Sequence, residues 1–261
     1  MNIELTNKTA LVCGGSKGIG KSVAIELASL GANVILMARS KSELDDTRKG
    51  LDTSKGQSHS CYSVDMTDRD GLQSVVDAIL TQTNIHILIN NTGGPPSGPI
   101  LSATEDDFIK ALGMHVGASQ LLVKAVLAGM KTDGYGRVIN IISTSVKVPI
   151  AGLGVSNTTR GAMASWAKTL AGELGPHGIT VNNVLPGFTN TGRLQYIIDN
   201  RAKKNSTTAD VVADTMKGQV PLGRFAKPEE VAAMVAFLAS PAAAYVTGTS
   251  IRVDGGRTKS I

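Results

Sequence analysis

The stretch TALVCGGSKGIGKSVAIELASL, residues 9–30, decides the fold of this chain. Its first residues are an apolar run typical of a buried parallel strand, and apolar residues recur at helical spacing in its second half. Between them lies a glycine cluster whose important members are Gly14, Gly18 and Gly20. Glycine lets the backbone turn tightly and approach a ligand closely. A strand, a glycine-rich turn and a helix in this order predict a pyrophosphate site at the positive N-terminus of the helix.

Apolar runs of strand length alternate with longer helical patterns along the rest of the chain. This alternation predicts an α/β fold of Rossmann type, a doubly wound parallel sheet flanked by helices, in one domain of residues 1–261. The expected strands are 10–13, 34–38, 59–64, 85–90, 137–142, 180–185 and 250–253. The expected helices are 18–30, 42–51, 68–82, 105–130, 153–174 and 228–238. The polar stretch 189–218 interrupts this rhythm, and we interpret it as a substrate lid, with an inert surface loop as the alternative.

Composition narrows the class of protein further. The 261 residues are 42% hydrophobic and 18% charged, which suits one soluble domain, and the net charge of +5 is mild. No basic run with interleaved aromatic residues indicates nucleic-acid binding. Cys13 and Cys61 lie far apart without metal-ligand spacing, so we expect free thiols and no metal. We see no basic-then-apolar leader and no apolar run near the ~20 residues that span a bilayer, and we expect a cytoplasmic protein without membrane contact.

The end of the second expected strand carries cations where a carboxylate would indicate NAD(H). In NAD-binding versions of this fold, an acidic residue near this point binds the ribose 2′-hydroxyl. The sequence here is MARSKSE, so Arg39 and Ser40 stand at this point, no carboxylate appears before Glu43, and Lys17 lies in the glycine loop. A 2′-phosphate would meet two cations and no anion, which favours NADP(H) over NAD(H). The alternative is that both cations are only solvated.

The spacing Gly-x-x-x-Gly-x-Gly in the glycine loop resembles that of the short-chain dehydrogenase/reductase family, and in particular of 3-oxoacyl-carrier-protein reductases. Residues 89–94, INNTGG, resemble the family's Asn-Asn-Ala-Gly pattern, with Thr92 in the place of alanine. Pro186-Gly187 followed by two threonines resembles the family's Pro-Gly loop, and the segments from residues 220 and 246 resemble its closing helix and last strand. The resemblance spans residues 8–256, almost the whole chain.

The resemblance implies a dinucleotide site along the carboxyl ends of the strands. Within it, Asp65 is expected to contact the adenine amino group, and a threonine of the Pro-Gly loop to hold the nicotinamide carboxamide. The implied cofactor-binding residues are Gly14, Ser16, Lys17, Gly18, Ile19, Gly20, Arg39, Ser40, Asp65, Met66, Asn91, Thr92, Gly93, Arg160, Pro186, Gly187, Thr189 and Thr191.

The resemblance also implies a reaction, hydride transfer between nicotinamide and a carbonyl or alcohol, but the expected proton donor is missing. The family uses a Tyr-x-x-x-Lys motif, a serine that holds the substrate oxygen, and an asparagine that holds a water. Ser143 matches the family's serine. Ser156 stands at the tyrosine position, Arg160 at the lysine position and His115 at the asparagine position.

These departures affect catalysis more than cofactor binding. Arg160 can bond ribose hydroxyls, but its charge is permanent. Ser156 is a far weaker acid than a phenol with a pKa of ~10. His115, with an ordinary pKa near ~6.5, is the best other proton donor by chemistry, although it is equally readable as a helix histidine bonded to backbone. A water or Tyr196 in the expected lid are further candidates, and lid packing is the simpler reading of Tyr196.

Two interpretations therefore remain open. The first is an NADP(H)-dependent oxidoreductase with a non-standard catalytic site that acts on a small carbonyl or alcohol. The second is an NADP(H)-binding scaffold or sensor that has lost turnover. The resemblance implies a homotetramer or homodimer in either case, with the helices that begin near Glu105 and Leu153 packing across subunits.

Overall fold

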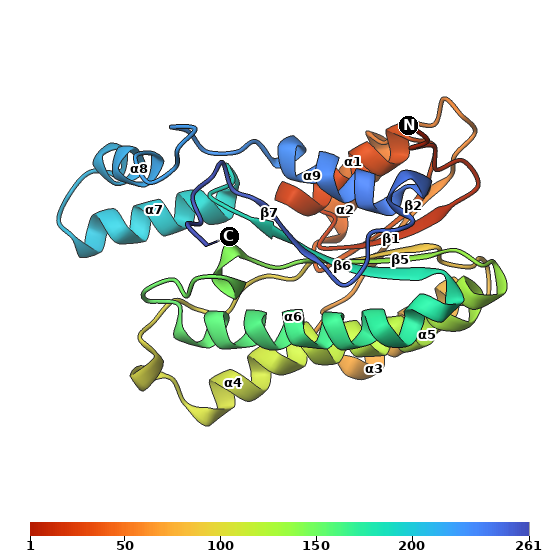
Figure 1. The fold of residues 1–261 in the computed structure, drawn as a ribbon, viewed down its shortest axis with the longest axis horizontal. Coiled ribbons are helices and arrows are strands. Elements are labelled where there is room, and N and C mark those ends of the chain that lie inside the picture. The colour runs from red at the N-terminus through yellow and green to blue at the C-terminus, as the bar shows by residue number, and fades with distance from the viewer. Residues whose placement is uncertain (261) are drawn as a thin grey trace.

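Seven parallel strands form one sheet at the centre of the computed structural model, which describes residues 1–260 (Figure 1). The strand order is β3-β2-β1-β4-β5-β6-β7. The strands are β1 (Thr9–Cys13), β2 (Asn33–Ala38), β3 (His59–Ser63), β4 (Ile87–Asn90), β5 (Gly136–Ile141), β6 (Ile179–Pro186) and β7 (Ser250–Val253). The predicted Rossmann-type fold is confirmed, with small differences at strand ends. The order reverses between β1 and β4, which opens a crevice at their carboxyl ends.

Helices cover both faces of the sheet (Figure 1). One face carries α1 (Gly18–Ser29), α2 (Lys41–Lys49) and α9 (Pro228–Ala239). The other carries α3 (Arg69–Leu80), α4 (Glu105–Leu112), α5 (Ala118–Thr132) and α6 (Gly154–Leu174). The remaining two, α7 (Gly192–Lys204) and α8 (Ala209–Lys217), lie together at one end of the molecule.

Strand β1 shows why continuous apolar runs mark the centre of this fold. Successive side chains of a strand point to opposite faces of the sheet. Ala10 and Val12 therefore pack in the core under α1 and α9, whereas Leu11 and Cys13 pack in the core against α3, α5 and α6. All four side chains are fully buried, as expected for a parallel sheet covered on both faces.

A row of buried amides crosses four strands. Asn90 Nδ2 donates to Asn140 Oδ1 at 2.8 Å, and Asn140 Nδ2 donates to Asn183 Oδ1 at 2.9 Å. Asn183 Nδ2 donates to Ser250 Oγ at 3.0 Å, which extends the row to β7. These hydrogen bonds join β4, β5, β6 and β7 and offset the cost of burying the amides. The row depends on the register between strands, so sequence reasoning did not find it.

The expected helix 105–130 is interrupted by a π-helical turn. Residues Gly113–Gly117 form this turn between α4 and α5. Arg69 supports it, because its Nη2 donates to the carbonyl of Gly113. The same guanidinium lies close to Gly117, since a Cβ on Gly117 would stand 3.2 Å from Arg69 Nη2. Single π turns inside helices are frequent at functional sites. This one contains His115.

The continuous helical segment Glu105–Thr132 is long and apolar enough to cross a membrane by length and composition alone. From the sequence no such run was expected, because charged residues stand at the start of this segment. In the structure one face of α5 packs in the core of the sheet through residues such as Leu122 and Val126, as a core helix does.

The polar stretch 189–218 is not an irregular loop but contains α7 and α8. Thr191 and Thr208 cap their N-termini by accepting hydrogen bonds from Leu194 N and Val211 N. The two helices share a small core of Leu194, Ile198, Ala202, Val212 and Met216. The spacing of its first three members is helical, but the polar residues between them obscured the pattern.

Candidate active site

The glycine loop leaves no room for a Cβ at Gly14 or Gly20. Gly14 has φ +63°, which favours glycine, and a Cβ on Gly20 would lie 2.1 Å from the carbonyl oxygen of Gly14. Asn91 follows β4 and fixes the loop, because its Nδ2 donates to the carbonyls of Cys13 and Gly14 at 3.3 and 3.5 Å. Asn91, predicted as a cofactor residue, thus holds the loop that would cradle the phosphates.

The Pro-Gly loop after β6 reaches back to the glycine loop. Thr191 Cγ2 would lie 3.3 Å from a Cβ on Gly18, so the start of α7 stands over the start of α1. Gly187 N donates to Val253 O, and Thr189 is buried, which ties this loop to the end of β7. The structure therefore brings the start of the helix after the Pro-Gly loop, which was predicted to hold the nicotinamide carboxamide, next to the glycine loop, which was predicted to hold the pyrophosphate.

The predicted 2′-phosphate residues surround the N-terminus of α2. Ser40 caps this helix, and the side chains of Arg39 and Lys17 are exposed. Glu43 in the first turn of α2 pairs with Lys17, with Nζ and Oε1 3.4 Å apart. A helix N-terminus with a serine cap and two nearby cations suits a phosphate. Sequence reasoning missed that Glu43 competes for Lys17.

The remaining predicted cofactor residues line the same edge of the sheet. Asp65 Oδ1 accepts hydrogen bonds from Thr67 N and Oγ1, and these bonds hold the pKa of Asp65 below its usual value. The carbonyl of Ser16 accepts a hydrogen bond from Thr47 Oγ1 at 3.2 Å. The others, Ile19, Met66, Gly93 and Pro186, lie in or beside the loops that follow β1, β3, β4 and β6.

Ser143 and Ser156 belong to two elements that pack together at the end of β5. Ser143 follows β5 and accepts a hydrogen bond on Oγ from Ser145 N at 3.1 Å. Ser156 lies in the first turns of α6, half-buried. An alcohol gives up its proton far less readily than a phenol with a pKa of ~10, so neither serine is a strong acid. Ser143 Oγ can still donate a hydrogen bond to a substrate oxygen.

Arg160 is the most deeply buried charged group of the candidate site. Its residue is 8% exposed, and Nη1 donates to the carbonyl of Ile141 at 3.2 Å. Its Nε is buried without a hydrogen-bond partner in the described residues. Burial, and then the charge of Arg193, lower the pKa of Arg160 to about 10, so it stays charged at neutral pH.

His115 and Thr92, two departures from the family pattern, contact each other. A short hydrogen bond joins His115 Nδ1 and Thr92 Oγ1. His115 is 3% exposed, and its Nε2 has no partner within residues 1–260. Burial, and then the charge of Arg160, lower the pKa of His115 to about 3. His115 is therefore a neutral imidazole at neutral pH, and it is not held as an imidazolium donor.

The residues present fit a phosphorylated dinucleotide. Because the loop has no Cβ at Gly20, its backbone amides could approach a pyrophosphate closely. Arg160 has an unused donor, Nε, that could bond a hydroxyl group. With Ser143 nearby on the end of β5, the arrangement can bind a dinucleotide and orient a carbonyl oxygen. It contains no phenol at the tyrosine position and no lysine at the next helical turn.

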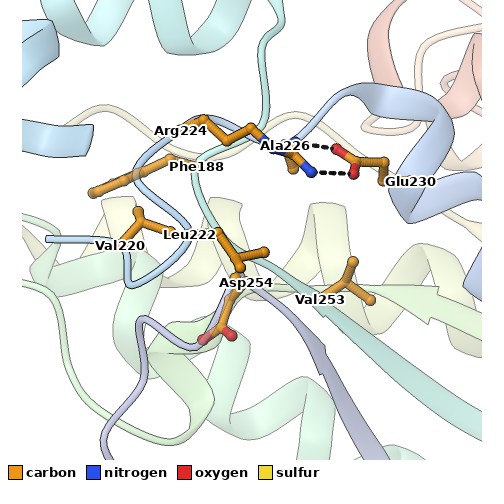
Figure 2. Close-up of a pocket in the computed structure, with 9 residues that line it drawn as sticks. Phe188, Val220, Leu222, Arg224, Ala226, Glu230, Val253 and Asp254 are labelled. Atoms are coloured by element: carbon orange, nitrogen blue, oxygen red, sulfur yellow. Dashed lines mark hydrogen bonds and ion pairs between the residues drawn. The ribbon is translucent and has the colours of Figure 1, made fainter. Parts of the chain in front are cut away.

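A separate cavity of about 100 Å³ lies beside the segments that follow β6 and β7 (Figure 2). Phe188, Leu222 and Val253 line it, and Arg224 and Glu230 form a two-bond ion pair at 2.6 and 2.7 Å beside it. No predicted catalytic residue lines this cavity. It is therefore distinct from the site built by the carboxyl ends of β1, β4 and β5.

Comparison with known proteins agrees with this fold and site. A family model described as enoyl-(acyl carrier protein) reductase matches residues 14–258. The NADPH-dependent reductase BacG of Bacillus subtilis is 30% identical over 259 residues, covering 98% of this chain and 100% of the relative. The 3-oxoacyl-[acyl-carrier-protein] reductase FabG of Vibrio cholerae is 34% identical over 258 residues, with 98% of both chains covered.

A solved structure extends the comparison to three dimensions. The L-sorbose reductase of Gluconobacter frateurii, crystallised with NADPH and L-sorbose, superposes with a TM-score of 0.94 at 29% identity, covering 100% of both chains. The chain belongs to the short-chain dehydrogenase/reductase family, and to its branch similar to 3-oxoacyl-carrier-protein reductases. The resemblance predicted from the glycine loop is confirmed.

Proposed function

We propose that this protein is an NADP(H)-dependent oxidoreductase that reduces a carbonyl group of a small molecule, or oxidises the corresponding alcohol. The observation that carries the proposal is the continuous edge formed by the glycine loop, the capped N-terminus of α2 and Ser143 at the end of β5. One similar protein is named an NADPH-dependent reductase and another was crystallised with NADPH, which supports the choice of cofactor. Its two free thiols, Cys13 and Cys61, suit a reducing, cytoplasmic setting.

The 2′-phosphate is the group that distinguishes the two nicotinamide cofactors. In our proposal Lys17 and Arg39 bind it, with Ser40 and the N-terminus of α2. Glu43 would release Lys17 when the phosphate binds, because an exposed ion pair is weak. The bound cofactor supplies a hydride.

The residues of the chain would orient the substrate and the cofactor ribose. Ser143 Oγ donates to the carbonyl oxygen, and Arg160 donates to the ribose hydroxyls through Nε, which has no partner among the described residues. The proton for the product alkoxide comes from a water, Ser156 or His115. The neutral state and burial of His115 favour water among these three.

A carbonyl panel with NADPH tests this proposal. We expect consumption of NADPH with at least one ketone or aldehyde, and a large loss of kcat in Ser143→Ala with unchanged NADPH affinity. Thr144→Ser, which alters the neighbouring buried residue and keeps its hydroxyl, is the control. Equal turnover in Ser143→Ala would contradict the assigned role of Ser143.

A second candidate function is an NADP(H)-binding scaffold or sensor, and the absence of a strong acid at Ser156 favours it. The double substitution Ser156→Tyr/Arg160→Lys separates the two functions. Turnover only in the double variant would support the sensor, whereas turnover that the double variant destroys would support the enzyme with a non-standard site.

Subunit assembly and lid movement belong to the same proposal. Ile109 and Leu112 on α4 are 58% and 37% exposed, which suits a homotetramer or homodimer formed through the α4, α5 and α6 face. The helices α7 and α8 would act as the substrate lid, because α7 begins over the glycine loop. Sedimentation velocity measures the first of these expectations.

A further inference from the structure

Two guanidinium groups converge on one point beside Ser143 and the glycine loop. Gly94 lies in the loop after β4, and a Cβ on it would stand 3.8 Å from Nη2 of Arg160 and also 3.8 Å from Nη2 of Arg193. The two nitrogen atoms are therefore no farther apart than twice that distance. Arg160 comes from α6 and Arg193 from the first turn of α7.

Neither guanidinium has a negative partner among residues 1–260. In the described part of the chain, Arg160 donates to the carbonyl of Ile141, and Arg193 Nη2 donates to the carbonyl of Pro95 at 3.3 Å. None of the ion pairs within residues 1–260 includes Arg160 or Arg193. The other titratable group that faces Arg160 is His115, which is neutral at neutral pH.

A buried cation without a counter-charge is costly, and a second cation beside it increases the cost. A ligand that brings negative charge removes this cost. The guanidinium fork matches the two oxygens of a carboxylate, and two forks from different helices can hold both oxygens at once.

We infer that Arg160 and Arg193 form a carboxylate-binding subsite, so that the substrate of this enzyme is an oxo acid or a hydroxy acid rather than a neutral ketone, sugar or thioester. The inference rests on the proposed function, because it concerns the substrate of the same site. Arg160 also contacts the strand end that carries Ser143, since its Nη1 donates to the carbonyl of Ile141. The carboxylate would therefore lie near the reacting carbonyl.

The position of Arg193 makes substrate binding dependent on the lid. Arg193 is exposed on α7, outside the core that α7 and α8 share. Its guanidinium lies over the ring of Tyr196, 5.6 Å from the ring centroid. A carboxylate held between Arg160 and Arg193 would connect α6 to α7 and stabilise the lid over the bound substrate.

Calorimetric titration of protein saturated with NADP⁺ tests the inference, because a ketone is not reduced under these conditions. The probes are 2-oxobutanoate and 4-oxopentanoate, which place the carboxylate at two distances from the ketone. Their uncharged counterparts are 2-oxobutanamide and 4-oxopentanamide. We expect at least one oxo acid to bind about tenfold or more tightly than its amide.

Variants assign the effect to the two arginines. Arg193→Gln should remove the preference for the acid, and it should leave the fold intact because Arg193 is exposed. Lys203→Gln removes the same charge from the exposed last turn of α7 and should keep the preference. Arg160→Lys keeps the positive charge but replaces the planar guanidinium with an ammonium group, which cannot bond both carboxylate oxygens in the same way. It should weaken binding of the oxo acid by about tenfold.

Three outcomes would overturn the inference. Acid and amide could bind equally, or Arg193→Gln could retain the preference for the acid. Alternatively, Arg193→Gln could weaken NADPH binding instead, which would assign the arginines to the cofactor phosphates. Failure of the proposed function is distinguishable, because it appears earlier as a failure of the unmodified protein to bind NADP⁺ at all.

Discussion

Thr92 and His115, 23 positions apart in the sequence, are joined by a short hydrogen bond between Oγ1 and Nδ1 at the edge of the candidate site. The family pattern has alanine and asparagine at these positions. The two departures therefore form a matched pair, in which the threonine hydroxyl satisfies one nitrogen of a buried imidazole.

The burial of His115 predicts acid sensitivity. The folded-state pKa of about 3 lies below the ordinary value of 6.5, so the unfolded chain binds a proton that the native chain does not. The free energy of unfolding should fall as pH decreases from about 6.5 towards 3, by up to a few kcal/mol. Urea unfolding across this range measures it.

His115→Asn should flatten this part of the pH profile. His177→Asn, at an exposed position, is the control and should leave the profile unchanged. Acid sensitivity that persists in full in His115→Asn would assign it to other groups, such as the partly buried His86, whose pKa is also lowered by burial.

Thr92→Ala should destabilise the native state although it restores the alanine of the family pattern. It leaves Nδ1 of a buried imidazole without a partner, which costs about 1–3 kcal/mol. Thr92→Ser keeps the hydroxyl and should recover most of the loss. Chemical denaturation of both variants measures the difference, and equal stability of Thr92→Ala and the unmodified protein would refute the pairing.

Glu43→Gln should raise the affinity for NADPH by about two- to fivefold, because Lys17 then has no competing carboxylate. The gain should shrink at high salt, since the pair is exposed. Fluorescence titration with NADPH at two salt concentrations provides the measurement, with Glu26→Gln on α1 as the control. A loss of affinity in Glu43→Gln would mean that Glu43 itself contacts the cofactor.

The amide row should contribute to stability as a unit. Asn140→Leu strands Asn90 Nδ2 and Asn183 Oδ1 and should lower the free energy of unfolding by about 2–5 kcal/mol. Asn90→Leu/Asn140→Leu removes both partners of the first bond. Its cost should be smaller than the sum of the two single substitutions, and strict additivity would show that the two amides are not coupled.

Local sequence predicted what depends on local pattern. The buried strands and most helices were recognisable from apolar runs such as that of residues 10–13, because both faces of a parallel sheet are covered. The glycine loop was recognisable because its spacing is set by backbone clearance at Gly14 and Gly20. Helices α7 and α8 were missed because only a few residues, such as Leu194 and Ile198, face their small core.

Contacts between distant segments could not be predicted from the sequence. The bond between Thr92 and His115, the contact of Arg69 with the π-helical turn and the approach of Arg193 to Arg160 all depend on how strands and helices pack. The family resemblance had already placed Thr92, His115 and Arg160 at the site, but it did not show what they contact. Those contacts appear only in the three-dimensional arrangement.

Titration with both reduced nicotinamide cofactors tests the central claim most directly. The account predicts that NADPH binds at least about tenfold more tightly than NADH, and that Lys17→Gln/Arg39→Gln removes this difference while NADH affinity stays the same. Equal binding of NADPH and NADH by the unmodified protein, or binding of neither, would contradict it.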